Sequence, residues 1–153
     1  RLRRFATDPH PTWEHALPGG ATLVRELRLD RGRNTLRLRF TLRGAPEADL
    51  VLAPLTADRD HHALQRRWDD APVTSEADGD HGWRVRLFSG ASLLRLSLPG
   101  ARWERAGWWN ERIFLEREAS RGFDAVQDLF CPAVARVPLR DGAPVVLTAT
   151  IEE

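Results

Sequence analysis

Hydrophobic and polar residues alternate along much of the chain with a period of two. In the segment NTLRLRFTLRG, one face carries Leu36, Leu38, Phe40 and Leu42, and the other face carries arginines and a threonine. Strict alternation over eight residues is typical of a strand with one buried face. The preceding segment, TLVRELRLDRGRN, also reads as a strand, so the pattern predicts a hairpin with its turn at Asp30–Asn34.

Further segments with strand character follow, separated by glycines and prolines. They are ADLVLAPLT (48–56), WRVRLF (83–88), SLLRLSL (92–98), NERIFLERE (110–118) and APVVLTATIE (143–152). Helix signals are poor, and the best is a short one around Ala63–Trp68. These segments and the turns between them predict seven or eight strands in one all-β domain over residues 1–153, an antiparallel β-sandwich.

Composition and charge narrow the function classes. All 23 basic residues are arginine, and 22 acidic residues balance them. This balance argues against nucleic acid as a partner, because nucleic-acid-binding proteins usually carry a basic excess. No apolar run approaches the roughly 18 residues that a membrane helix needs, and one cysteine cannot form an internal disulfide. We therefore expect a cytoplasmic protein with no membrane partner. Because the chain begins RLRRF rather than with Met, we also expect a piece of a longer protein.

The segment TADRDHHALQRRW, residues 56–68, crowds charges and imidazoles together in the run Asp58, Arg59, Asp60, His61 and His62. Adjacent histidines on a strand point to opposite faces, so they cannot easily share one metal ion. A third ligand would have to be a neighbouring aspartate or the distant His81, and this spacing matches no common zinc pattern. We therefore predict no metal site and expect these groups to fix a turn or a short helix by local hydrogen bonds.

Glu116 and Glu118 lie two residues apart, so on a strand they would share one face with about 7 Å between their Cα atoms. The two carboxyl groups of a glycosidase active site lie a similar distance apart, so one interpretation is that Glu116 and Glu118 act as a catalytic acid and base. Three neighbouring arginines offer salt-bridge partners instead, and we favour that structural role because exposed ion pairs are far commoner. Gly122 permits positive φ, which predicts a tight corner at Arg121–Asp124.

Six tryptophans are a high count for 153 residues. Trp13, Trp83 and Trp103 can all fill a core. Trp108 and Trp109 are adjacent, so on a strand one ring faces inward and the other outward. An exposed ring can stack on the apolar face of a sugar, although core or interdomain packing is the commoner role.

Cys131 precedes a proline and has no histidine at a known catalytic spacing. We interpret it as a small buried residue rather than a nucleophile. The sequence contains no GxSxG elbow, no P-loop and no dinucleotide-binding fingerprint. We therefore expect no cofactor and no catalytic residue within this chain.

The segment ERIFLEREASRGFDAVQDLFCPAVARVPL resembles a stretch of the N-terminal domain of bacterial and archaeal glycogen debranching enzymes, the amylo-α-1,6-glucosidase type. That stretch has a Glu, then Arg-Gly-Leu-Asp, two residues, Glu-Asp-Leu-Phe and Pro-Gly. LAPLTADRDHHAL resembles the same domain's Pro-Leu … Arg-Asp-x-His stretch. DPHPTWEH, LVRELRLDRGRNTLRLRF and PVVLTATIEE fall in the family's order, so the resemblance covers nearly the whole chain.

The resemblance implies a non-catalytic, supersandwich-like domain, of which this chain would be an interior slice. In the complete enzyme the sandwich precedes a helical α/α toroid that carries the glucosidase carboxylates and hydrolyses α-1,6 branch points of glycogen or limit dextrins. The expected partners are therefore the protein's own C-terminal helical catalytic domain and, in the full enzyme, α-glucan. An isolated slice would expose an apolar face and self-associate.

Three positions depart from the family's pattern. Gln127 stands where the family usually has Glu, Cys131 stands near a common Ser, and Ala133 replaces the usual Gly. The missing carboxylate at Gln127 argues against proton chemistry in this segment.

The resemblance instead implies a surface that meets the catalytic domain near its cleft. The polar residues of that surface would be Arg121, Asp124 and Asp128. A second set would fix a loop by hydrogen bonds near the sugar cleft, and comprises Arg59, Asp60 and His62. Two other functions stay open: a stand-alone α-glucan-binding module that uses Trp108 or Trp109, and a β-sandwich interaction domain with no role in sugar binding.

Overall fold

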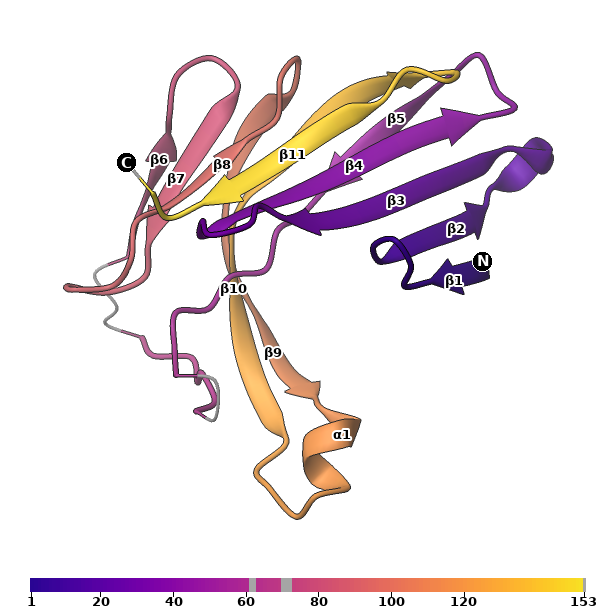
Figure 1. Cartoon of the computed structure of the whole chain (residues 1–153). Coiled ribbons are helices and arrows are strands. Elements are labelled where there is room, and N and C mark those ends of the chain that lie inside the picture. Colours follow the sequence, from indigo (N-terminus) through magenta and orange to yellow (C-terminus); the bar gives the residue numbers. More distant parts are fainter. Residues whose placement is uncertain (61–62, 70–72, 153) are drawn as a thin grey trace.

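Two antiparallel sheets dominate the computed structural model, which describes residues 1–60, 63–69 and 73–152 (Figure 1). The large sheet contains, in spatial order, β1 (Leu2–Ala6), β2 (Thr12–Ala16), β3 (Thr22–Leu29), β4 (Thr35–Arg43), β11 (Val145–Thr150), β8 (Leu94–Ser97), β7 (Gly82–Arg86) and β6 (Thr74–Ala77). The small sheet contains, in order, β5 (Glu47–Leu52), β10 (Val126–Arg140) and β9 (Arg102–Phe114). A one-turn helix, α1 (Glu116–Ala119), and a 3₁₀ turn at Pro18–Gly20 complete the described elements. The predicted all-β antiparallel sandwich is confirmed.

The alternating pattern places β3 and β4 as the sequence predicts. They form an antiparallel hairpin in which Leu23 lies opposite Leu42 and Leu29 lies opposite Leu36. Because side chains alternate between faces, these leucines share the inner face of the large sheet with Phe40. Their polar neighbours in sequence occupy the outer face.

The core lies where β4, β11, β8 and β7 face the small sheet. Phe40 and Leu42 of β4 and Leu139 of β10 belong to one buried cluster, and Leu42 has no exposed surface. Ala133 and Ala135 of β10 are also fully buried in this cluster. Large and small side chains therefore meet across the interface, which is how a sandwich core fills its volume.

The small sheet covers only part of the large one. In Figure 1, β1, β2 and β3 lie to one side of β9 and β10. On these strands Phe5 is 52% exposed and Leu29 is 70% exposed, although the strand register places Leu29 opposite the inner-face residue Leu36. One end of the sandwich therefore presents an apolar inner face that no other described residues cover.

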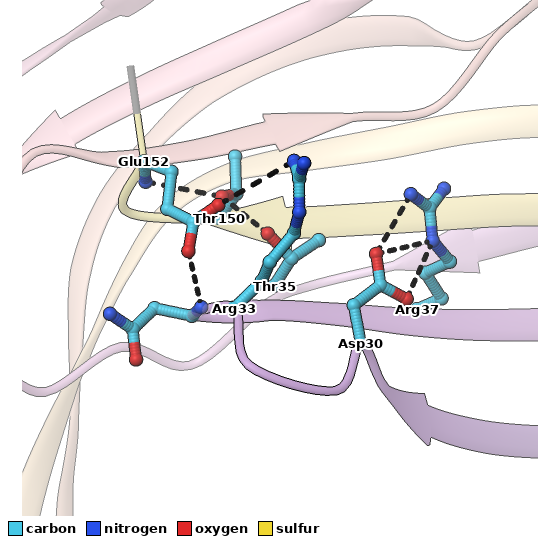
Figure 2. A network of polar contacts seen from close by, with 7 residues as sticks. Asp30, Arg33, Thr35, Arg37, Thr150 and Glu152 are labelled. Carbon is cyan, nitrogen blue, oxygen red and sulfur yellow. Dashed lines mark hydrogen bonds and ion pairs between the residues drawn. The ribbon is translucent and has the colours of Figure 1, made fainter.

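A polar network joins the β3–β4 turn to the end of β11 (Figure 2). Arg37 forms a two-nitrogen contact with the Asp30 carboxylate, with Nη2 3.0 Å from Oδ2. Thr35 and Thr150 hydroxyls lie 2.8 Å apart, and Glu152 accepts a 2.7 Å hydrogen bond from the Asn34 N–H. These contacts fix the turn against the last strand.

No helix among the described residues is long and apolar enough to cross a membrane.

Two local predictions are wrong. Residues 63–69 contain no helix, and the strand expected over 110–118 ends at Phe114, after which α1 begins. Glu116 and Glu118 therefore lie on one helical turn rather than on a strand face. The sequence Glu-Arg-Glu-Ala favours helix, and Gly122, with φ of 79°, ends the turn.

The described chain has eleven strands instead of the seven or eight expected. The sequence pattern did not single out β1, β2, the four-residue β6 or the 15-residue β10. The alternation of polar and apolar residues does not identify β10, because both its faces are buried over much of its length and because it contains prolines. Pro132 lies at a register shift between Cys131 and Ala133, and Pro138 lies beyond the last residue paired with β9, where no ladder N–H is needed.

Candidate functional site

The outer halves of β9 and β10 project away from the sandwich and carry α1 at their end (Figure 1). We call residues 108–129 the arm. Gly107 has φ of 74° at its base, and Arg112 has φ of 58° within β9. The pairing with β10 shifts register between Gln127 and Leu129. Such irregularities bend a ribbon, so they account for the departure of the arm from the sandwich.

The base of the arm contacts residues 56–60 and 63–68, which we call the junction loop. Thr56 and Phe130 exchange backbone hydrogen bonds of 2.8 and 3.1 Å, and the Thr56 hydroxyl donates to the same Phe130 carbonyl. Arg67 also forms an ion pair with Glu111 of the arm. Residues that are far apart in sequence are therefore held side by side.

Asp128 is the polar centre of this junction. Its carboxylate accepts hydrogen bonds from the backbone N–H groups of Arg67, at 2.8 Å, and Arg112, at 2.7 Å. These two donors lower the pKa of the Asp128 carboxyl, because they stabilise its charged form more than partial burial opposes it. The bond to Arg112 holds that residue in its positive-φ backbone conformation, which residues other than Gly rarely adopt.

Gln65 makes the second connection. Its Nε2 donates to the carbonyls of Thr56, at 3.2 Å, and Asp128, at 3.1 Å, while its Oε1 accepts from the Asp58 N–H. The Gln65 carbonyl in turn accepts from the Asp128 N–H at 2.8 Å. One buried amide thus joins the loop to itself and to β10.

The two adjacent tryptophans have different environments. The Trp109 ring packs edge-on against Trp68 with centroids 5.0 Å apart, and against Phe130 at 5.3 Å. Trp108 is 46% exposed on the arm. Trp108 is therefore the exposed ring of the pair, and Trp109 belongs to an aromatic cluster beneath the junction loop.

The other tryptophans divide in the same way. Trp83 is buried in the main core, and Trp103 packs against that core while it remains partly exposed. Trp13 lies on β2, beside the open end of the sandwich, where its ring is 5.2 Å from that of Phe5.

Arg59 and Asp60 lie in the exposed part of the junction loop. The Arg59 guanidinium donates to the carbonyls of Asp60, at 3.1 Å, and Ala63, at 2.6 Å. Asp58 accepts a 2.6 Å hydrogen bond from the Ser92 N–H, which anchors the start of the loop. His62 lies outside the described residues.

The surface expected from Arg121, Asp124 and Asp128 divides into two places. Arg121 and Asp124 are exposed at the end of the arm, whereas Asp128 is 9% exposed at its base. Backbone hydrogen bonds from Arg121 and Phe123 to the Glu118 carbonyl form the corner predicted around Gly122. Asp128 therefore positions the arm, and only the other two residues can meet a partner at its end.

Phe114 and Phe123 are the residues at the end of the arm that the sequence reasoning did not select. They precede and follow α1, and they are 62% and 59% exposed. A hydrogen bond of 2.7 Å from the Leu115 N–H to the Ala125 carbonyl closes the base of this turn. The sequence signal for Phe123 was its place within the corner predicted at Arg121–Asp124, whereas Phe114 fell within the strand predicted over 110–118 and nothing marked it as exposed.

The described residues contain no group of three or more His, Cys, Asp or Glu side chains that could hold a metal ion. Cys131 is fully buried, and burial raises the pKa of its thiol. The neutral thiol that results is a poor nucleophile.

An apolar groove of about 550 Å³ lies at the open end of the sandwich. Its wall on the large sheet includes Leu38, Phe40 and Leu147, and Leu55 lines it from the segment after β5. Arg25 is the charged residue in this lining. The groove ends at the start of the junction loop, where Thr56 and Ala57 complete its lining.

The junction yields a prediction about acid stability. The substitution Asp128→Asn removes the negative charge and one of the two acceptor oxygens. We therefore expect this variant to unfold at a lower temperature than the wild type at pH 7. Because the pKa of Asp128 is lowered in the folded state, its stabilisation is present above the pKa of an unfolded aspartate and is lost as the pH falls through the folded value. The difference in melting temperature should therefore shrink towards pH 3.

Thermal melts followed by circular dichroism between pH 7 and pH 3 measure this difference. The matched control is Asp124→Asn, an exposed carboxyl at the end of the arm. A gap between Asp128→Asn and wild type that stays constant with pH would show that the charge is not what stabilises the junction.

One family model, described as "Glycogen debranching enzyme N terminal", matches residues 1–146 of the chain. The match extends from β1 into β11, so it includes both sheets and the whole arm. No curated protein and no solved structure matches the chain.

Proposed function

Because the chain belongs to the glycogen debranching enzyme N-terminal family, we propose that it is the non-catalytic β-sandwich domain of an α-1,6-glucosidase that acts on glycogen or limit dextrin. In this proposal the sandwich supports a helical catalytic domain. That domain supplies the two carboxylic acids, of which one protonates the glycosidic oxygen and the other activates water or attacks the sugar.

The observation that carries the proposal is the exposed apolar end of the arm. Phe114 and Phe123 present two aromatic rings to solvent beside Arg121 and Asp124. Exposed apolar side chains that are clustered and bordered by polar groups are typical of protein-protein contacts. A projecting ribbon held rigidly at its base by Asp128 and the junction loop can position such a contact.

The carboxyl groups with shifted pKa support a non-catalytic role. Among the described residues these are Glu26, Asp30 and Asp128, and in each the pKa is lowered, chiefly by hydrogen bonds from His10, Arg37 and the Arg67 backbone respectively. A glycosidase general acid needs the opposite shift, so that it keeps its proton near neutral pH.

The test measures binding of this chain to the separately purified helical domain of a glycogen debranching enzyme by titration calorimetry. We expect Phe114→Ser with Phe123→Ser to weaken binding by about tenfold or more, the loss typical of interface aromatic anchors. The control is Val51→Ser, which also removes an exposed apolar side chain, 47% exposed on β5.

Equal affinities of the arm variant and the control would refute the arm as the contact. Release of glucose from limit dextrin by the chain alone, in proportion to its concentration, would refute the non-catalytic role.

Trp108 favours a second candidate function, a stand-alone α-glucan-binding module. Its ring is 46% exposed, and an exposed indole can stack on a glucose face. Affinity electrophoresis through gels with and without glycogen tests this function. Retardation that disappears in Trp108→Ala would favour it, and unchanged mobility of the wild-type chain would exclude it.

A further inference from the structure

Arg25 is a cation on an apolar surface. In the strand register it lies opposite Phe40 on β4 and opposite Trp13 on β2, and both neighbours share the inner face of the large sheet. Its guanidinium carbon is 4.3 Å from the centre of the Trp13 ring. Its Nε is buried and has no hydrogen-bond partner among the described residues.

Three arginines on the outer face of the same strands are placed differently. Arg39 lies 3.5 Å from the Glu26 carboxylate, Arg37 lies 3.0 Å from Asp30, and Arg4 lies 3.5 Å from Glu14. Within the described part of the chain, Arg25 has no such carboxylate. Arg25 as a whole is only half-buried, and a guanidinium on an apolar surface without a carboxylate favours one supplied from outside these residues.

The surface around Arg25 is apolar and open. Arg25 lines the 550 Å³ groove together with leucines of β4, β8 and β11. Leu29, which is more than half exposed, also lines this groove, and the same face continues over β1–β3 to Phe5, which is likewise more than half exposed. The small sheet lies to one side of these strands in Figure 1. A layer of polypeptide that covered this face would bury both the apolar residues and Arg25.

We propose that this face, formed by the inner side of β1–β4 and the groove, binds a β-structured polypeptide segment of a partner that carries alternating apolar side chains and one Asp or Glu opposite Arg25. The apolar side chains fill the groove. The carboxylate pairs with the terminal nitrogens of the guanidinium, an arrangement that fixes the register of the bound segment. This inference does not depend on the arm or on the proposed function.

A second copy of this chain fits the face less well. The strand register places Phe5, Trp13, Leu23, Arg25, Leu27, Leu29, Leu36 and Leu38 on the inner face of β1–β4. No carboxylate is among them, so a face-to-face dimer would bury Arg25 against apolar or cationic groups. Charge complementarity therefore favours an acidic partner over self-association.

The test uses fluorescently labelled, terminally blocked peptides in which Val and Thr alternate and the central residue is Glu, Gln or Lys. Fluorescence anisotropy measures their binding to the wild-type chain. We expect the Glu peptide to bind about tenfold more tightly than the Lys peptide, with the Gln peptide between them. This comparison uses one folded protein, so it does not depend on the stability of any variant.

The variant Arg25→Gln should remove the preference for Glu. The control, Arg43→Gln, removes the same charge from an exposed position on the outer face of β4 and should keep the preference. Equal affinity for the three peptides, or no binding of any of them, would overturn the proposal. It would also be overturned by a dimer, detected by sedimentation, that excludes the peptides and forms equally well with Arg25→Gln.

Discussion

Replacement of Trp109 by alanine is expected to lower the free energy of unfolding by about 3 kcal/mol, whereas replacement of Trp108 is expected to change it by less than about 0.5 kcal/mol. The two residues are adjacent and chemically identical, so the difference depends only on their surroundings. Trp109 contacts Trp68 and Phe130 with ring centroids 5.0 and 5.3 Å apart, while Trp108 is 46% exposed. Urea denaturation followed by far-ultraviolet circular dichroism measures both values.

The Trp109 change should also loosen the junction loop. The Trp68 ring lies on Trp109 and reaches Phe88 at 6.3 Å, so the cavity would remove the support beneath residues 63–68. Amide hydrogen exchange at Arg67 and Asp128 should therefore accelerate in Trp109→Ala and stay unchanged in Trp108→Ala. If the two variants were equally stable, Trp109 would not be the anchor of the arm.

The periodicity of the sequence predicted the parts of the fold where one face is buried and the other is solvated. Strands β3, β4, β7, β8 and β11 were found because their side chains alternate in this way. It failed for β10, whose central residues are buried on both faces and which contains two prolines. It also failed for α1, because four residues of alternating charge fit one helical turn as well as a short strand.

The candidate site was only partly predictable for a different reason. The sequence singled out Asp128, but nothing local showed that its carboxylate accepts from Arg67, 61 residues earlier, as well as from Arg112. Such long-range pairing depends on the sheet topology, which places the junction loop beside β10. The adjacency of Trp108 and Trp109 did predict that one ring would be packed and the other exposed, but not which one.

Gln65 provides the most direct test of how the junction loop is held. Its side chain is 5% exposed and serves three backbone groups, the carbonyls of Thr56 and Asp128 and the N–H of Asp58. Leucine has a similar size and none of these hydrogen bonds. Because Gln65→Leu leaves these buried backbone groups without partners, we expect it to lower the free energy of unfolding by about 2 kcal/mol.

Gln127→Leu is the matched control, because Gln127 is a buried glutamine of β10, next to Asp128. It is 6% exposed, and its Oε1 has no hydrogen-bond partner among the described residues. Removal of a buried polar atom that is already unsatisfied costs little, so this variant should be within about 0.5 kcal/mol of wild type or more stable. Equal losses in the two variants would mean that both glutamines act through packing alone. A loss confined to Gln65→Leu would show that its three hydrogen bonds hold the loop against the arm, in addition to the aromatic contacts of Trp109.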